Sequence, residues 1–149
     1  MKLSTRSRYG TRLLLEMAIH YKEGPIQLAE IARRQEVSTK YLEQIIIPLK
    51  KAGYVNSMRG PKGGHMLAMS PDTIRLGEVV ALLEGGLGVT ECVDHPEGCR
   101  RAGFCMTRFL WKEISEAIRD RLDSFTLLDL VHMRPEDRDG VFNCISGPR

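Results

Sequence analysis

The pattern that most constrains the fold is a short helix, a tight turn and a capped second helix within residues 28–53. Apolar residues at helical spacing define both helices, and Ser38 or Thr39 is a suitable N-cap for the second. Two lysines precede Gly53, as expected where a helix ends. This order predicts a helix-turn-helix. Pro48 lies inside the second helix and predicts a kink or an early loosening of its last turn.

A glycine-rich hairpin follows the second helix directly. Residues 54–59 are predicted to form one strand, residues 60–64 the turn and residues 65–69 the returning strand. A hairpin after a recognition helix is a wing, and the helix itself is narrow enough to enter a DNA major groove. The sequence therefore predicts a mainly α fold with a small β-hairpin, in which a winged helix-turn-helix DNA-binding domain occupies residues 1–84.

The charge distribution favours a polyanionic partner for this half of the chain. The net charge is only +3, but residues 1–62 hold twelve Lys and Arg against five Glu, whereas residues 63–149 hold ten against fourteen Asp and Glu. Clustered cations release counterions from a phosphate backbone on binding. Scattered solvated charges are the alternative interpretation.

The DNA contacts are expected at the start of the second helix and at the wing. Glycines at the turn allow a close backbone approach to the sugar-phosphate wall, and cations there can reach phosphates or a narrow minor groove. Glu43 repels phosphate but can accept a hydrogen bond from cytosine N4, so it is a candidate specificity element unless it is merely solvated. The candidates are Ser38, Lys40, Tyr41, Glu43 and Gln44 on the helix, and Arg59, Gly60 and Lys62 on the wing.

The second half of the chain is organised around a loop and a long helix. A helix over residues 76–84 stops at two glycines, and residues 85–105 have no sustained periodicity and are expected to need a ligand to become ordered. From Met106 an apolar stripe marks a long dimerisation helix, followed by a short helix, within residues 106–131; the alternative is that the long helix folds back onto its own domain. Residues 132–149 are expected to form a polar tail.

Three cysteines lie in that loop, with the spacing Cys92-x6-Cys99-x5-Cys105. The sequence shows no signal peptide and no stretch near the ~20 apolar residues that span a bilayer, so the expected location is the cytoplasm, with no membrane partner. Thiols in a reducing compartment favour metal or redox chemistry over disulfides. The wide spacing suits an iron–sulfur cluster better than a single zinc ion, although a zinc site and free thiols remain alternatives.

Several short motifs stand out along the chain: Arg8-Tyr9-Gly10, Gly24-Pro25, Tyr41-Leu42-Glu43-Gln44, Arg59-Gly60-Pro61, Gly63-Gly64, Gly77-Glu78-Val79, the three cysteines and Leu110-Trp111. Together they resemble the iron–sulfur cluster regulator family of bacterial winged-helix transcription factors, which includes IscR-like and NsrR-like branches. The resemblance covers about residues 1–131. It implies a homodimer that binds palindromic promoter DNA, with a [2Fe–2S] or [4Fe–4S] cluster held by the three cysteines, and it adds Arg8 and Tyr9 to the DNA-binding residues.

The fourth cluster ligand departs from the family pattern. Arg108 stands where the IscR-like branch has a histidine, and Arg8 stands near where the NsrR-like branch supplies a carboxylate from the partner subunit. The remaining candidates are a non-protein ligand or one of Asp94, His95, Cys144, His20 and Glu16.

These observations predict a homodimeric transcriptional regulator that senses iron–sulfur status, redox state or nitric oxide. One alternative is a cluster-free thiol- or metabolite-sensing repressor of the same fold. Another, from a different class, is a zinc-stabilised interaction module. An enzyme is not expected, because the chain shows no Ser/His/Asp set, no phosphate loop and no paired acids.

Overall fold

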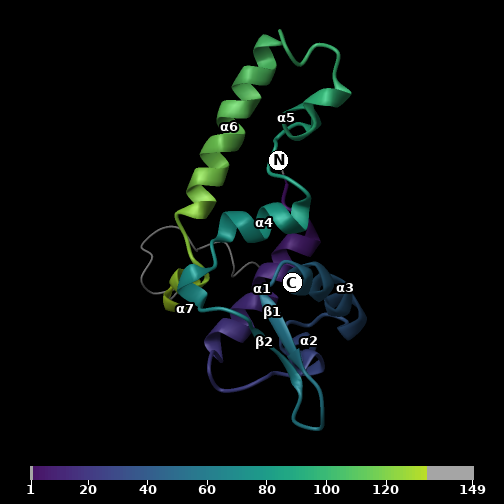
Figure 1. The fold of residues 1–149 in the computed structure, drawn as a ribbon, viewed down its shortest axis with the longest axis vertical. Helices are drawn as coiled ribbons and strands as arrows, with labels where there is room; N and C mark the ends of the chain where they lie inside the picture. The colour runs from purple at the N-terminus through teal and green to yellow at the C-terminus, as the bar shows by residue number, and fades with distance from the viewer. Residues whose placement is uncertain (1, 134–149) are drawn as a thin grey trace, which may run out of the picture.

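The periodicity of the sequence is realised as a mainly helical fold with one antiparallel hairpin, as predicted (Figure 1). The structure is a computed structural model and describes residues 2–133. No helix in this part of the chain is both long and apolar enough to cross a bilayer. The elements in order are α1 (Thr5–Ile19), α2 (Leu28–Arg34), α3 (Thr39–Lys51), β1 (Val55–Met58), β2 (Gly64–Leu67), η1 (Pro71–Thr73), α4 (Leu76–Glu84), α5 (Glu91–Asp94), η2 (Pro96–Gly98), α6 (Met106–Asp123) and α7 (Leu127–His132).

The predicted helix-turn-helix is confirmed and is formed by α2 and α3. The Ser38 hydroxyl caps α3 by accepting from the backbone N–H of Tyr41 (3.2 Å). The predicted loosening at Pro48 is wrong: α3 continues to Lys51, and the N–H of Ala52 donates to the Pro48 carbonyl (3.0 Å). The donor that proline lacks would have paired with the carbonyl of exposed Gln44, which water can reach, while neighbouring side chains of the last turns are buried in the core.

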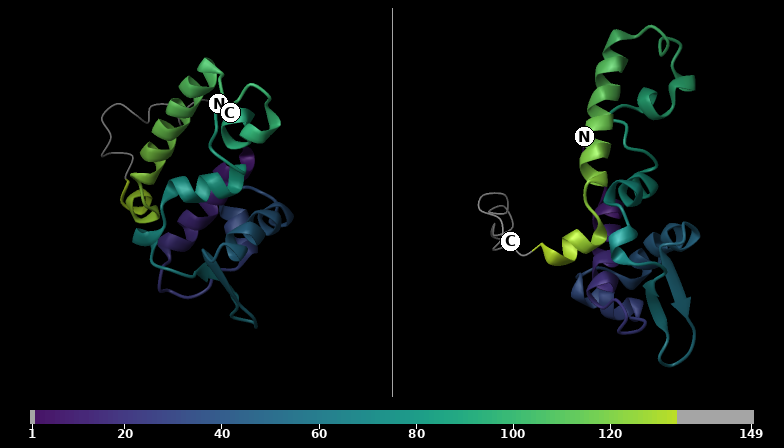
Figure 2. Two further views of the ribbon diagram at one scale, coloured as in Figure 1. Left: turned by 45° about the horizontal axis from the view of Figure 1, so that its top comes forward. Right: turned by 60° about the vertical axis from the view of Figure 1, so that its left-hand side comes forward.

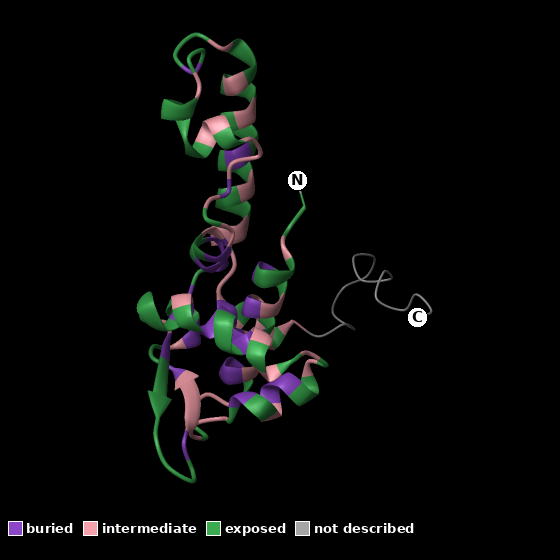
Figure 3. Ribbon diagram, turned by 90° about the vertical axis from the view of Figure 1, so that its right-hand side faces the viewer, coloured by how far each residue is buried: buried purple, intermediate pink, exposed green. Residues whose placement is uncertain are grey.

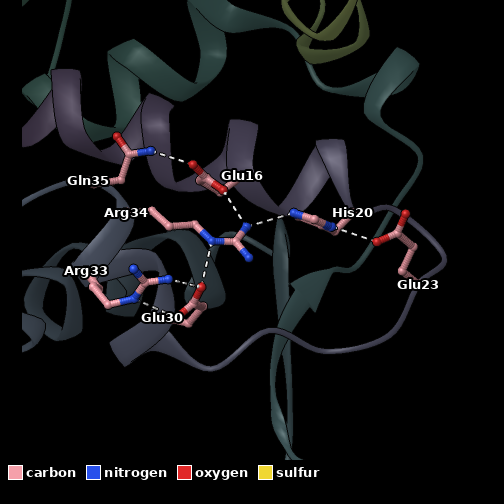
Figure 4. Close-up of polar contacts among 7 residues, drawn as sticks. All are labelled: Glu16, His20, Glu23, Glu30, Arg33, Arg34 and Gln35. Atoms are coloured by element: carbon pink, nitrogen blue, oxygen red, sulfur yellow. Dashed lines mark hydrogen bonds and ion pairs between the residues drawn. The ribbon is translucent and has the colours of Figure 1, made fainter.

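The helix-turn-helix is also held to α1 by a network of charged side chains (Figure 4). Arg34 of α2 donates to Glu16 (3.2 Å) and to His20 (2.8 Å) from α1 or its C-terminal end, and to Glu30 of its own helix (2.9 Å). Gln35 donates to the other oxygen of Glu16 (2.6 Å). These bonds fix the angle between α1 and α2 from the outer side, and the apolar core fixes it from the inner side.

The hairpin forms the wing and is shorter than predicted. Only its inner ends are apolar and buried, at the paired residues Val55 and Leu67, so the strands stop where the core stops supporting them. Its stem is tied to the body by two backbone hydrogen bonds between Ile26 and His65 (2.9 and 2.8 Å). At Gly64 a Cβ atom would collide with the Ile26 carbonyl oxygen, so the close approach of these two backbones requires glycine.

The hydrophobic core lies in a compact body formed by the other main helices and the hairpin, and α6 extends away from this body as an arm (Figures 1 and 2). Helix α1 packs against α3, α4 and α7, and the buried residues gather there (Figure 3). Helix α6 packs its C-terminal part on α4, but Phe109, Leu110 and Ile114 remain 50, 53 and 38% exposed, and only Ser115 of this helix is buried. The apolar stripe is therefore not folded back onto its own domain.

The loop that precedes α6 is more regular than predicted, because it contains α5 and η2. The capped short helix near residue 126 is confirmed, with Thr126 and Asp129 forming a reciprocal capping box. The predicted polar tail from residue 134 onward, including Cys144, lies outside the described residues.

Candidate nucleic-acid interface and cysteine loop

The start of α3 and the tip of the wing present the candidate DNA contacts to solvent. On α3, Lys40, Glu43 and Gln44 are exposed, whereas Tyr41 is half-buried. Ser38 is exposed too, but its hydroxyl oxygen already accepts the capping bond, which leaves its O–H and one lone pair for DNA. The wing candidates Arg59, Gly60 and Lys62 all lie exposed beyond the strands.

The cations of this face are available for phosphate. Within residues 2–133, none of Arg8, Lys40, Arg59 and Lys62 has a carboxylate partner within salt-bridge distance. In contrast, Arg33 and Arg34 on the outer side of α2 are both paired with Glu30. Exposed cations without a carboxylate partner can pair with phosphate.

Tyr9 connects α1 to the start of α3. Its ring packs edge-to-face on Tyr41 with centroids 6.0 Å apart and an interplanar angle of 87°. The guanidinium of Arg12 lies 5.1 Å from the centre of the Tyr9 ring. The structure thus gives Tyr9 a packing role beside the DNA-binding role predicted for it. Arg12 is an exposed cation that the sequence reasoning missed, although its place one turn after Arg8 on α1 was a usable signal.

His65, at the stem of the wing, was also missed. Its Nδ1 lies 2.9 Å from the Ser57 hydroxyl across the hairpin. Burial, and then the charge of Lys50 on α3, lower the pKa of this imidazole, so it is neutral at physiological pH and holds the wing stem by a hydrogen bond.

The three cysteines occupy one loop but are not gathered at one point. Cys92 lies in α5, Cys99 follows η2, and Cys105 is the N-cap residue of α6; all three are partly exposed. Cys92 and Cys99 line a common hollow of about 490 Å³ together with His95, and Cys105 is not part of its lining. Among the described residues, no group of three Cys, His, Asp or Glu side chains is placed to hold a metal ion.

Each of two thiols has a hydroxyl neighbour. Thr90 Oγ1 lies 3.4 Å from the Cys92 sulfur, and Thr107 Oγ1 lies 3.2 Å from the Cys105 sulfur. The Thr107 hydroxyl, followed by the backbone N–H of Arg108, lowers the pKa of the Cys105 thiol, and the charge of Arg101 adds to this effect.

The residue at the family's histidine position and four of the candidate fourth ligands make other contacts. Arg108, at the histidine position, donates from Nε to the Cys92 carbonyl (2.7 Å) and from Nη1 to the Ala102 carbonyl (3.3 Å). Asp94 accepts from the N–H of Gly88 (2.8 Å), and His95 lies 3.4 Å from Glu97. Both Glu16 and His20 belong to the network around Arg34 (Figure 4).

The same contacts pair backbone groups of the loop with side chains of this chain. Arg108 bonds to both arms of the loop, Asp94 closes its first turn, and the N–H of Val89 donates to Ser115 Oγ on α6 (3.0 Å). Three side chains thus satisfy backbone groups that a glycine-rich loop leaves open. The expectation that the loop needs a ligand to become ordered stays a prediction.

Comparison with known proteins agrees with this architecture. The profile of the Rrf2 family, described as iron-dependent transcriptional regulator, matches residues 3–133. The protein rrf2 of Nitratidesulfovibrio vulgaris strain Hildenborough is 46% identical over 131 residues, which cover 88% of this chain and 87% of that protein. The HTH-type transcriptional regulator IscR of Erwinia tasmaniensis is 40% identical over 132 residues, which cover 89% and 79%, respectively.

Two solved structures share the fold closely. T. potens IscR superposes with a TM-score of 0.75 at 36% identity, covering 95% of this chain and 93% of that chain. CymR (YrzC), the global cysteine regulator of B. subtilis, superposes with a TM-score of 0.73 at 39% identity, covering 89% and 97%. These relatives are regulators rather than enzymes. The family profile spans almost all of the described residues, and the chain belongs to the Rrf2 family of winged-helix transcriptional regulators.

Proposed function

We propose that this regulator is a cytoplasmic homodimer that binds promoter DNA and changes its DNA affinity with the state of its cysteine loop. The observation that carries the proposal is the connection of two features in one chain. An exposed face with unpaired cations lies on α3, the wing and α1, and three partly exposed thiols lie on the loop between α4 and α6.

The apolar stripe on α6 supports the dimer. Large apolar side chains left exposed along a helix mark an interaction surface, and most soluble homo-oligomers are two-fold dimers. A second copy of α6 presents a matching stripe. A two-fold dimer also presents two copies of α3 to the two half-sites of a palindrome.

The cofactor proposed for the loop is an iron–sulfur cluster held by Cys92, Cys99 and Cys105. Thiolates are the ligands that such clusters take, three of them leave one position for a further ligand, and a bound cluster makes a site sensitive to iron supply, oxidants and nitric oxide. The family description and the IscR relatives support this assignment. In the arrangement described, Cys105 lies outside the hollow shared by the other two thiols, so ligation by all three requires the loop to shift.

A cluster-free thiol sensor is the second candidate. It is favoured by two specific observations: Cys92 and Cys99 line a hollow without the third thiol, and Asp94, Arg108 and Ser115 bond to backbone groups of the loop. The structural similarity to CymR, named for cysteine regulation, fits this candidate.

The visible spectrum of protein purified without oxygen distinguishes the two. We expect brown charge-transfer absorption that is lost when Cys92, Cys99 and Cys105 are all changed to Ala. Titration of both proteins against one promoter fragment at fixed salt should then show a difference in affinity of roughly 5- to 150-fold. A colourless protein whose affinity still responds to thiol oxidation would replace the cluster with the second candidate. Equal affinities in every loop state, with folded dimers, would refute the sensor altogether.

A further inference from the structure

Glu84 occupies the junction between the DNA-binding body and the cysteine loop. It is the last residue of α4, and Gly85 behind it adopts a left-handed conformation (φ 83°) that turns the chain into the loop. Oε1 of its carboxylate accepts a hydrogen bond from the backbone N–H of Ser4 (2.8 Å), which lies 80 residues earlier in the sequence. Ser4 is the N-cap of α1, and its own hydroxyl accepts from the N–H of Ser7.

The negative charge of Glu84 destabilises the C-terminus of its own helix and stabilises the N-terminus of another. A carboxylate is unfavourable at the C-terminus of a helix, where the backbone dipole is negative, and favourable at an N-terminus. Glu84 stands at the C-terminus of α4 and at the N-terminus of α1. Partial burial raises its pKa, but hydrogen bonds from the buried Ser7 hydroxyl and from Ser4 together hold this pKa below its usual value. The carboxylate is thus kept ionised by α1.

The first half of α1, whose N-terminus Glu84 contacts, is packed closely against both α4 and α3. At Gly10 a Cβ atom would overlap the Leu83 side chain of α4 and would lie 3.2 Å from Ile45 of α3. One residue earlier, Tyr9 packs on Tyr41 in the first turn of α3. Close-packed interiors are hardly compressible. A displacement of the last turn of α4 therefore has to displace α1 and α3 as well.

We propose that Glu84 is a positioning residue that transmits the state of the cysteine loop to the DNA-reading helix. When the loop rearranges, the last turn of α4 and its carboxylate move relative to Ser4, and the start of α1, which carries Arg8 and Tyr9, moves with them. This inference rests on the proposed function, because it names the contact through which the loop would act on DNA affinity.

Glu84→Ala and Glu84→Gln test the contact, with Asp72→Asn as a matched control. Asp72 is an exposed acid of η1, away from α6, for which the structure shows no hydrogen bond or ion pair within the described residues. For each background, promoter affinity is measured with the three cysteines intact and with all three changed to Ala. We expect the roughly 5- to 150-fold ratio between the two loop states to fall close to one in Glu84→Ala. It should recover in part in Glu84→Gln, whose amide oxygen still accepts from Ser4, and stay unchanged in Asp72→Asn.

Hydrogen exchange provides a readout that does not depend on DNA. In Glu84→Ala the backbone amides of residues 4–8 should exchange several-fold faster, with unchanged exchange in the core of α3 showing that the protein is folded. A full ratio in Glu84→Ala would overturn the inference and leave the proposed function standing, as would an equal loss of affinity in both loop states. A ratio of one in the unsubstituted protein would overturn the proposed function, and with it any signal for Glu84 to transmit.

Discussion

Individual side chains at the DNA face divide into those used by the fold and those left free. Ser38 caps α3, and Tyr9 packs on Tyr41, so substitution of either disturbs the start of α3 as well as any DNA contact. Arg59 and Glu43 are exposed and have no ion-pair partner within residues 2–133. These two therefore give the cleanest tests of DNA binding.

Replacing Arg59 with Ala should weaken binding to all operator variants by about 1–3 kcal/mol, because a wing cation contributes phosphate or groove contacts. Fluorescence anisotropy at several salt concentrations measures the loss and should show a shallower salt dependence. Arg119→Ala on α6 is the control, since it removes the same charge far from the wing. A loss well below 1 kcal/mol for Arg59→Ala would contradict the wing assignment.

Replacing Glu43 with Ala should broaden the set of DNA sequences bound, because repulsion of phosphate and a preference for cytosine are removed together. Selection of binding sites from a random library compares the two proteins. The same motif and the same affinity for both would mean that Glu43 is only a solvated charge.

At the scale of the element, the helices were predictable and the loop was not. Apolar spacing and the Ser38 cap are local signals, and α2, α3, α4 and α6 formed where such signals predicted helices. The order of the loop depends on Asp94, Arg108 and Ser115, whose partners are main-chain groups with no sequence signature. For the same reason the cysteine spacing predicted a common site but could not show that Cys105 lies apart from the other two.

Arg108→Gln should loosen the cysteine loop, because the amide cannot bridge the Cys92 and Ala102 carbonyls as the guanidinium does. Amides of residues 92–103 should exchange several-fold faster, with the core of α1 unaffected. Arg100→Gln, an exposed arginine of the same loop, serves as the control. Unchanged exchange in Arg108→Gln would mean that the loop is ordered without this arginine.

The network between α1 and α2 gives a prediction for acid stability. Hydrogen bonds from Arg33 and then Arg34 lower the pKa of Glu30 from 4.5 to about 2. A lowered folded-state pKa stabilises the fold above pH 4.5, and this contribution is lost as the pH falls towards 2. The free energy of unfolding, measured by urea titration, should therefore decrease over this interval by more than it does in Glu30→Gln. If the free energy of unfolding depends on pH in the same way in both proteins, the Glu30 ion pairs contribute nothing to stability, which is common for exposed ion pairs.

At the scale of the whole molecule, the fold is a body that carries the winged helix-turn-helix and an arm, α6, with few buried residues (Figure 3). Large apolar side chains of this arm are exposed. The division follows from the sequence, since a small winged domain cannot bury an 18-residue amphipathic helix in addition to its own core. The direction of the arm could not be predicted, because it is set by the contact between the C-terminal part of α6 and α4.

Leu110→Glu should disrupt the dimer. The side chain is 53% exposed in the single chain, and burying a leucine contributes roughly 1.5–3 kcal/mol. In a two-fold interface the loss occurs in both subunits, so light scattering should find monomers at micromolar concentration, and binding to a palindromic operator should weaken strongly. The control Lys112→Glu changes charge on the same helix outside the stripe and should stay dimeric. A dimeric Leu110→Glu would place the interface elsewhere.

The attachment of the wing has a consequence for how such a regulator can change its target over evolutionary time. The direction of the hairpin is set by backbone contact between Gly64 and Ile26 and by the buried pair at its stem, none of which involves the tip. Arg59 and Lys62 can therefore be exchanged without changing the direction of the hairpin, whereas Gly60, with a φ of 115°, favours glycine. New promoter preferences are accessible through single substitutions at the tip, while Gly64 must remain glycine for any of them to be presented correctly.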